Sequence, residues 1–314
     1  MSKISVNDAL MGGKSLRDFL AYFLKISVQI VHDGSAKHHP VITTNVLKNI
    51  IGDDVDHPSE ILLNSAVTTI TGMAKRDDDE RILNQASSEG FGETAFISDL
   101  WNLFEIGDIE AIDLEAAKIH LASDKSPAVL ESLAEYALTN IPEFGSITYH
   151  ILRAFAFQND PKGSWPFVRC LLNEMKKVPS LEMHEGIDLH PRDSINYVIS
   201  EFNPARWLDF TSVFRIWTSE YVRTKNYHRE ISYWLDNACG VKPLAVLDNK
   251  ASPDLVEFFD DGNTYFIPIA EKLIENEKRL EKIPFLEALR VLAKRIQKKH
   301  LPLVQKRIEH LIAS

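Results

Sequence analysis

The sequence predicts an all-α protein, an irregular multi-helix bundle or a set of stacked helical pairs with roughly a dozen or more helices. Apolar side chains recur at intervals of three and four residues along most of the 314-residue chain, which is the spacing of a helix that buries one face. Prolines and small polar residues stand where several of these stretches begin, as they do in the first turn of helices. Only two short stretches, 241–247 and 264–267, look like strands.

The first expected helix begins after Ser15 as its N-cap and ends at His32-Asp33-Gly34, where glycine can adopt the left-handed cap conformation. Pro40 and Pro58 open the next two helices, because the N–H that proline lacks would be unpaired at that position anyway. Further helices are expected over 77–87, 93–106, 109–121, 126–139, 142–158, 165–178, 194–202, 204–222 and 227–239. The last three are expected over 267–281, 285–300 and 302–313.

The same pattern suggests a division of the chain into three parts. Residues 1–241 are expected to form the main helical domain. Residues 242–262 are rich in Pro, Asp and Asn and are expected to be an irregular connecting segment. Residues 263–314 are expected to form basic C-terminal helices that pack on the main domain.

The composition limits the kinds of ligand and the cellular location that can be expected for this protein. The chain has 35 Lys and Arg against 45 Asp and Glu, and a net charge of −10 repels phosphate backbones, so generic nucleic-acid binding is not expected. The two cysteines, Cys170 and Cys239, have no metal-ligand spacing and fit a reducing compartment. No apolar run approaches the roughly 20 residues that cross a bilayer, and no apolar segment follows the first residues. We therefore expect a soluble, cytoplasmic protein without a transmembrane segment.

The basic residues are concentrated near the C-terminus. Residues 271–314 hold 11 Lys and Arg against 6 Asp and Glu, and residues 288–308 hold no acid. A basic helix with an apolar opposite face can bind an acidic protein partner or an anionic membrane surface. It can also pack on the acidic remainder of its own chain, and the sequence favours this second interpretation.

Histidines supply the candidate catalytic residues. His32, His38 and His39 lie close together where two expected helices meet, and His150 lies on a helix that also carries Phe144 and Tyr149. Imidazoles at a helix junction or in an aromatic pocket suit general acid–base catalysis or ligand binding, which makes His32, His39 and His150 the candidates. The alternative is that all three are structural, as most buried or cap histidines are.

A second cluster suggests a metal site. His184, Asp188 and His190 lie within seven residues, around a glycine that would let the chain fold back. The alternative is a loop that is simply exposed.

Two stretches carry a resemblance to a known family. His39 is followed by Asn45 and Leu47 in the pattern His-x5-Asn-x-Leu, and an aromatic helix with His150 follows later in the chain. This combination resembles the all-helical questin oxidase-like proteins. The resemblance implies cytosolic, NADPH-linked oxygenation of an aromatic, polyketide-type substrate, with His39, Asn45 and His150 as the positions to test.

Two functional hypotheses follow from the sequence. The first is an enzyme, possibly an oxidoreductase, that acts on a small organic molecule in a helix-lined pocket containing histidine and aromatic residues. The second is a non-enzymatic scaffold or interaction module that recruits a protein partner through its basic C-terminal helices. The enzyme hypothesis requires His39 and His150 to converge in one closed cavity. The sequence does not indicate any particular cofactor by its own motifs.

Overall fold

The computed structural model describes residues 5–90, 96–178, 182–185, 188–239, 241–244, 250–277 and 279–314. Within these ranges the chain forms α-helices and short 3-10 helices, and the β contact present there is an isolated bridge between Ile30 and Lys75. The all-α fold expected from the sequence is confirmed.

The first half of the chain forms α1 (Val6–Ala9), α2 (Gly13–Ser27), η1 (Ala36–His38), α3 (Pro40–Ile51), α4 (Glu60–Ile70), α5 (Asp79–Glu89), α6 (Ile97–Ile106), α7 (Ile109–Ala122) and α8 (Ala128–Ala137). The second half forms η2 (Leu138–Asn140), α9 (Ile141–Ala156), α10 (Trp165–Met175), α11 (Pro191–Ser200), α12 (Pro204–Trp217), α13 (Thr224–Ala238), α14 (Pro253–Asp260), α15 (Phe266–Glu277), η3 (Leu280–Lys282), α16 (Ile283–Ala293), η4 (Lys298–His300) and α17 (Leu301–Ala313).

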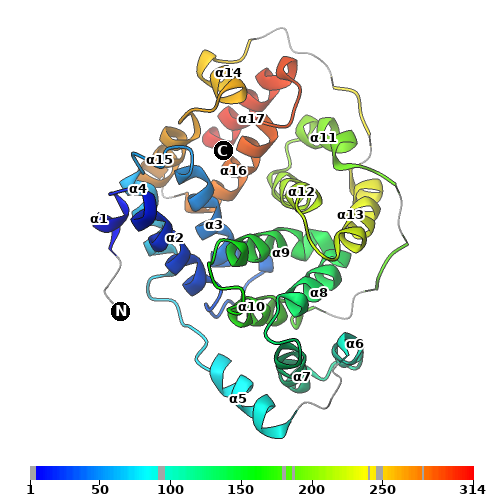
Figure 1. Ribbon diagram of the computed structural model, residues 1–314. Coiled ribbons are helices and arrows are strands. Elements are labelled where there is room, and N and C mark those ends of the chain that lie inside the picture. Colours follow the sequence, from blue (N-terminus) through cyan, green and yellow to red (C-terminus); the bar gives the residue numbers. More distant parts are fainter. Residues whose placement is uncertain are drawn as a thin grey trace.

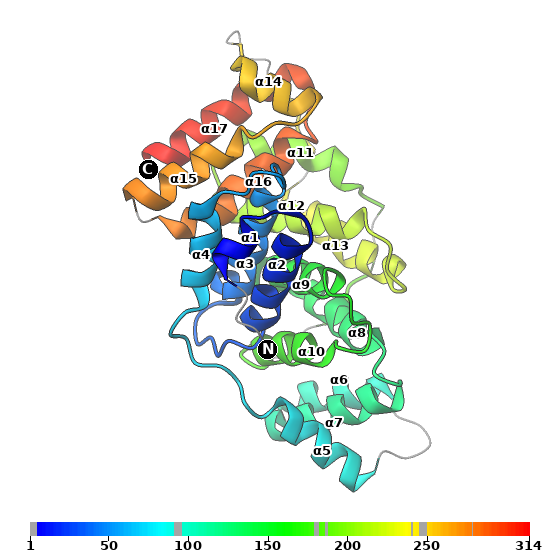
Figure 2. The same cartoon turned by 60° about the vertical axis from the view of Figure 1, so that its left-hand side comes forward.

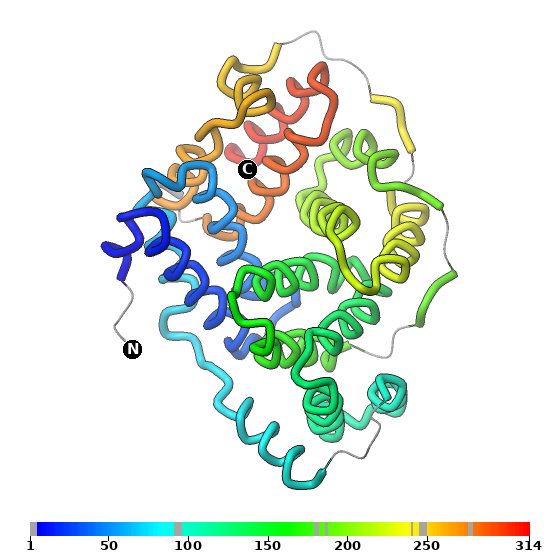
Figure 3. Tube along the Cα trace, viewed as in Figure 1, coloured from blue at the N-terminus to red at the C-terminus, as the bar shows by residue number. Residues whose placement is uncertain are grey.

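The helices are arranged along an elongated molecule. α5, α6 and α7 form one end, while α14, α15 and α17 lie at the other (Figure 1, Figure 2). α9 lies between these ends and packs against α3, α8, α10 and α12. The trace in Figure 3 shows α16, from near the end of the chain, beside α3, from near its start.

Four helices form a closed ring at the centre of the molecule. α3 packs on α9, α9 on α12, α12 on α16, and α16 back on α3. Each contributes fully buried apolar side chains to one continuous core, such as Val46, Ile147, Val213 and Leu289. Helices that are far apart in the sequence therefore meet around a common interior, and this interior positions the candidate site.

The C-terminal helices are part of this core. Leu286, Leu289 and Leu292 of α16 are buried, and α17 packs on α16 and α11. Several tail cations have partners inside the chain: Lys298 pairs with Asp260, and Arg307 donates to the carbonyl of Ile199. The basic tail is thus engaged with its own chain to a large extent, which leaves less of it for an external acidic partner.

The helix after Ser15 differs from its expected bounds. α2 begins at Gly13, with Gly12 as N-cap, and ends at Ser27 rather than at His32. The backbone N–H of Val31 donates to the carbonyl of Ala74 at 2.9 Å, and that of Arg76 donates to the carbonyl of Gln29 at 2.8 Å. These long-range bonds satisfy the backbone groups after residue 27, so the chain leaves the helix early.

Three further expectations are corrected. α4 begins after Ser59, whose Oγ accepts from the N–H of Leu62, and not at Pro58. Residues 264–265 form a turn, in which the Asn263 side chain accepts from the N–H of Tyr265, and residues 266–267 begin α15 instead of a strand. Of the other stretch expected as a strand, 241–244 is irregular and 245–247 lies outside the described residues.

The segment expected to be irregular, 242–262, contains α14. Ser252 caps this helix, Pro253 occupies its first turn, and Leu255 and Phe258 are buried. With only eight residues and several acids, α14 offers too short an apolar pattern to be recognised from periodicity.

No helix in the described ranges has both the length and the apolar character needed to span a bilayer.

Acid should destabilise the fold through its buried histidines. Burial, with nearby positive charges second, lowers the pKa of His39 and of His150 from 6.5 to about 3. In the unfolded chain these groups bind protons below about pH 6.5, whereas the folded chain leaves them neutral. We therefore expect the free energy of unfolding to fall by roughly 1–2 kcal/mol per histidine between pH 7 and pH 5. Urea denaturation at both pH values measures it.

His150→Gln provides the control for this expectation. The variant should show a smaller loss of stability between the two pH values than the wild type, whatever its stability at pH 7. Equal losses in both proteins would show that protonation of His150 does not contribute.

The α9–α12 contact depends on a glycine. A Cβ at Gly145 would lie 2.7 Å from Cγ2 of Ile141 and 3.3 Å from Cγ1 of Val213 on α12. Gly145→Ala should therefore lower stability by about 1–3 kcal/mol through overpacking. Helix propensity alone would raise stability by about 1 kcal/mol, so the sign of the change in a thermal or urea melt distinguishes the two effects. A stabilised variant would contradict the close approach.

Candidate functional site

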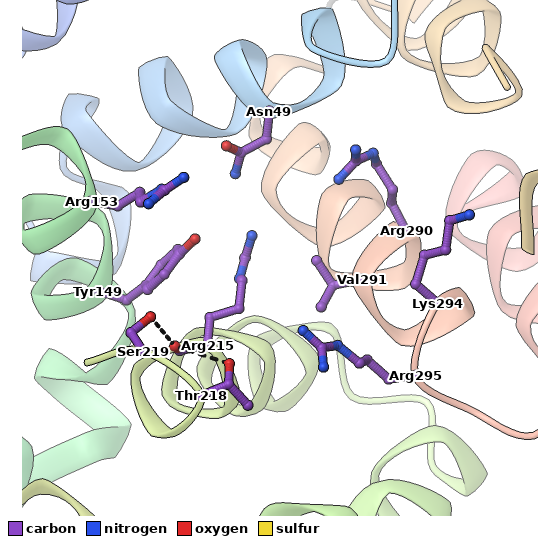
Figure 4. Close-up of a pocket in the computed structure, with 10 residues that line it drawn as sticks. All are labelled: Asn49, Tyr149, Arg153, Arg215, Thr218, Ser219, Arg290, Val291, Lys294 and Arg295. Carbon is purple, nitrogen blue, oxygen red and sulfur yellow. Dashed lines mark hydrogen bonds between the residues drawn. The ribbon is translucent and has the colours of Figure 1, made fainter. Parts of the chain in front are cut away.

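A pocket of about 400 Å³ lies among the four helices of the central ring (Figure 4). Its lining comes from all four helices and the residues that follow them: Asn49 from α3, Tyr149 and Arg153 from α9, Arg215, Thr218 and Ser219 from α12 and its C-terminal end, and Arg290, Val291, Lys294 and Arg295 from α16 and its C-terminal end.

The lining is strongly cationic. Five of these ten described residues carry a guanidinium or ammonium group, and none of the ten is acidic. Figure 4 shows the guanidinium groups of Arg153, Arg215 and Arg295 directed into the space between the helices. Such a concentration of positive charge is unusual in a chain whose net charge is −10.

The deepest cation of the pocket is held by a buried carboxylate. Arg215 donates from Nη1 and Nη2 to the two oxygens of Glu287 at 2.7 and 2.9 Å, and Glu287 is 0% exposed. Asn49 donates from Nδ2 to the same carboxylate at 3.0 Å. Burial alone would raise the pKa of Glu287, but the charge and hydrogen bonds of Arg215 outweigh it and lower that pKa to about 2. Glu287 therefore stays ionised.

Arg290 is paired in a similar way. Its Nε donates to Oδ2 of Asp53 at 2.7 Å, and its Nη2 donates to the other oxygen of the same carboxylate. Both bonds fix the guanidinium at the wall of the pocket between α3 and α16.

The other three cations have no carboxylate partner among the described residues. The guanidinium carbon of Arg295 lies over the ring of Phe214, 5.0 Å from the ring centre. Nζ of Lys294 donates to the carbonyl of Phe259 at 3.2 Å. Arg153 is exposed at the pocket and has no ion pair within the described ranges. Five cations against the two carboxylates of Glu287 and Asp53 leave an excess of three positive charges.

Tyr149 adds a neutral hydrogen-bond donor. Its side chain is buried, with the guanidinium of Arg215 over its ring at 4.3 Å. Burial raises the pKa of the phenol, so the hydroxyl keeps its proton and can donate to a bound oxygen atom. The hydroxyls of Thr218 and Ser219 instead donate to the carbonyl of Arg215, as the dashed lines in Figure 4 show.

The expected catalytic residues His32 and His39 lie elsewhere. The centres of their two rings lie 5.4 Å apart. His39 caps α3, because its Nδ1 accepts from the N–H of Val41. The other nitrogen, Nε2, faces Sγ of Cys170 at 3.6 Å, a contact that the sequence does not reveal. Burial raises the pKa of this thiol to about 12, so the pair stays neutral and cannot supply a thiolate nucleophile.

Two of the three positions that the family resemblance names, Asn45 and His150, lie in contact in the structure. Nδ2 of Asn45 lies 2.8 Å from Nδ1 of His150, and both side chains are fully buried. Nε2 of His150 and Oδ1 of Asn45 meet no partner in the described part of the chain. The walls of the cationic pocket, of a pocket between α2 and α3 and of a pocket at the N-terminal end of α3 include neither these two residues nor His32 and His39. Asn45 and His150 therefore line none of these three pockets. The NADPH that the resemblance implies would not reach them from any of the three, and no oxygenation step is derived from these two residues.

The expected metal ligands have other partners. His184 bonds through Nδ1 to Glu230 at 2.7 Å and stacks on Tyr233, while His190 caps α11 by accepting from the N–H of Arg192. Asp188 is exposed. Among the described residues, no group of three or more His, Cys, Asp or Glu is placed to hold a metal ion. His184 and His190 therefore engage different helices, α13 and α11, while Gly186, at which the metal hypothesis needs the chain to fold back, lies outside the described residues.

Only some of the residues at this pocket could be recognised from the sequence. Arg290, Lys294 and Arg295 belong to the basic tail, so their positive charge was visible. Glu287 is the stronger signal, because an acid between Leu286 and Ala288 falls within an apolar helix face where charges are rare unless paired. Its partner Arg215 lies on another helix, and the sequence alone does not connect them.

Comparisons with known proteins give no relative: no family model, no curated protein and no solved structure matches the chain.

Removal of the buried Arg215 should lower the free energy of unfolding far more than removal of the exposed Arg295. Arg215→Met leaves the Glu287 carboxylate buried without its bidentate partner, which we expect to lower the free energy of unfolding by about 3–5 kcal/mol. Arg295→Met, in the same pocket, removes an exposed cation and should lower it by less than about 1 kcal/mol. Urea denaturation of both variants measures the difference. Similar losses would mean that the ion pair does not stabilise the ring.

Proposed function

We propose that this protein binds a small anionic molecule, one that carries phosphate or carboxylate groups, in the cationic pocket of the central ring. The observation that carries the proposal is the pocket lining itself, with five cations and no acid among its ten described residues.

The charges support an anionic ligand because not all of them are neutralised by the protein. Glu287 and Asp53 compensate Arg215 and Arg290. The positive charges of Arg153, Lys294 and Arg295 are left at the pocket, and a cleft between low-dielectric walls strengthens their attraction for an anion. An acidic surface elsewhere would disfavour large polyanions, so a small ligand fits better than a nucleic acid.

The shapes of the donors support the same class of ligand. Guanidinium groups donate two parallel hydrogen bonds, which match the oxygen atoms of carboxylate and phosphate groups. Arg215 and Arg290 are held rigidly by their carboxylates, whereas Arg153 and Arg295 are exposed and can adjust to a ligand. Tyr149 supplies one neutral donor at the same pocket.

The proposal concerns binding, and it keeps the small organic ligand of the first sequence hypothesis. The histidines proposed as catalytic do not line this pocket, and its residues give no support to oxidoreductase chemistry. The scaffold hypothesis gains no support from the basic tail, because three of its cations contribute to the pocket.

Calorimetric titration with inorganic phosphate, pyrophosphate and citrate tests the proposal. We expect the wild type to bind at least one of these anions, with an affinity that falls as salt rises because the attraction is screened. Arg153→Met and Arg295→Met should each weaken binding by roughly ten- to a hundredfold, since a hydrogen bond to a charged group is worth about 1.5–3 kcal/mol. The double variant should lose measurable binding.

Arg81→Met is the matched control. Arg81 is an exposed arginine on α5, at the far end of the molecule, so its loss changes the net charge equally without touching the pocket (Figure 1). An affinity that falls as much in this variant as in Arg153→Met, or that survives in the double variant, would overturn the proposal.

A further inference from the structure

A second pocket, of about 320 Å³, lies between α2 and α3 and contains a buried lysine. Leu16, Leu20 and Ile51 supply apolar walls, and Phe157, at the C-terminal end of α9, supplies an aromatic one. Lys48 of α3 also lines the pocket, although its side chain is only 9% exposed. Lysine is rarely buried to this extent without a carboxylate partner.

Lys48 has no such partner among the described residues. Its Nζ donates to Oδ1 of Asn49 at 2.8 Å and lies 5.0 Å from the centre of the Phe157 ring. Neither contact carries a full negative charge, so the ammonium form of Lys48 is only weakly compensated.

The surrounding charges disfavour the ammonium form further. Arg153 of α9, Arg215 of α12 and Arg290 of α16 all act on Lys48 as like charges, and Glu287 is the opposing acid. Arg17 of α2 lies over the aromatic wall of this site, the Phe157 ring. Burial first, and Arg153 second, lower the pKa of Lys48 from 10.5 to about 7.

A lysine in this state has a free electron pair at neutral pH. A pKa near neutrality leaves a far larger fraction of Lys48 unprotonated at pH 7 than of a lysine at the ordinary value, which is almost wholly protonated there. Desolvation in an apolar pocket next to cationic groups is also the way in which enzymes activate nucleophilic lysines.

We propose that Lys48 is a nucleophilic amine that forms a reversible imine with a small aldehyde or ketone bound in the pocket between α2 and α3. The Nζ electron pair adds to the carbonyl carbon, the carbonyl oxygen takes up the protons of the amine, and one water molecule leaves as the carbon–nitrogen double bond forms. No electrons are transferred to or from another reactant.

The pocket limits the class of carbonyl compound. Leu16, Leu20, Ile51 and Phe157 favour a compact and largely apolar or aromatic body. Asn49 lines both this pocket and the cationic one, so the two sites are neighbours, but imine formation at Lys48 does not depend on anion binding.

Reductive trapping with benzaldehyde tests the proposal. The full-length protein is incubated at pH 7 with benzaldehyde and cyanoborohydride, which reduces an imine to a stable benzylamine, and the modified lysines are mapped by peptide mass spectrometry. Lys25, an exposed lysine on α2, is the internal reference. We expect Lys48 to be benzylated at least about tenfold faster than Lys25.

The pH profile provides a second readout in the same protein. Labelling of Lys48 should level off above about pH 8, because its amine has then lost its proton and no further nucleophile is released. Lys48→Met should remove the fast site, and the wild-type comparison stands even if this variant folds poorly. Labelling of Lys48 no faster than that of Lys25, or labelling of Lys48 that still rises well above pH 8, would overturn the proposal. Loss of phosphate binding with fast labelling at Lys48 would contradict only the anion site.

Discussion

The ion pair between Arg215 and Glu287 determines how the centre of this protein is built. A carboxylate that is wholly removed from water is stable only when its oxygens are fully hydrogen-bonded, and here Arg215 and Asn49 supply those bonds from two other helices. α3, α12 and α16 must therefore adopt one relative position. The apolar contacts of the ring would tolerate small shifts, but the bidentate geometry does not.

The same pair organises the electrostatics of the two neighbouring pockets. Glu287 lies behind Arg215, so the guanidinium stays fixed while its charge is largely compensated. The surplus of cations nearer the surface is left to act on whatever enters the cationic pocket. Burial first, and Arg153 second, lower the pKa of the neighbouring Lys48, while burial first, and Arg215 second, lower the pKa of the buried His150. One arrangement thus produces a pocket suited to anions and, next to it, an amine that is partly neutral.

Local patterns predicted much of the fold but little of the site. The helix of Pro40 was predictable because proline in the first turn and the apolar residues after it act within one segment. The end of α2 at Ser27 was not, because Val31 and Gln29 bond to residues beyond α4. Likewise, the charge of Arg290 and Lys294 could be seen, but their convergence with Arg153 and Arg215 arises only when four distant helices pack together. The histidines show the opposite case. The sequence suggests catalytic roles for His39 and His150, whereas in the structure His39 caps a helix and His150 is a buried partner of Asn45.

The position of α16 in the sequence has a consequence for the order of folding. α3, α9 and α12 are synthesised well before α16, which is needed to close the ring and to supply Glu287. Until then Arg215 has no carboxylate, and the apolar faces around it have no cover. Contacts of such large sequence separation slow folding and leave hydrophobic surface open to aggregation during translation. The interval between the emergence of α12 and that of α16 from the ribosome is therefore the period in which the nascent chain is most exposed to aggregation.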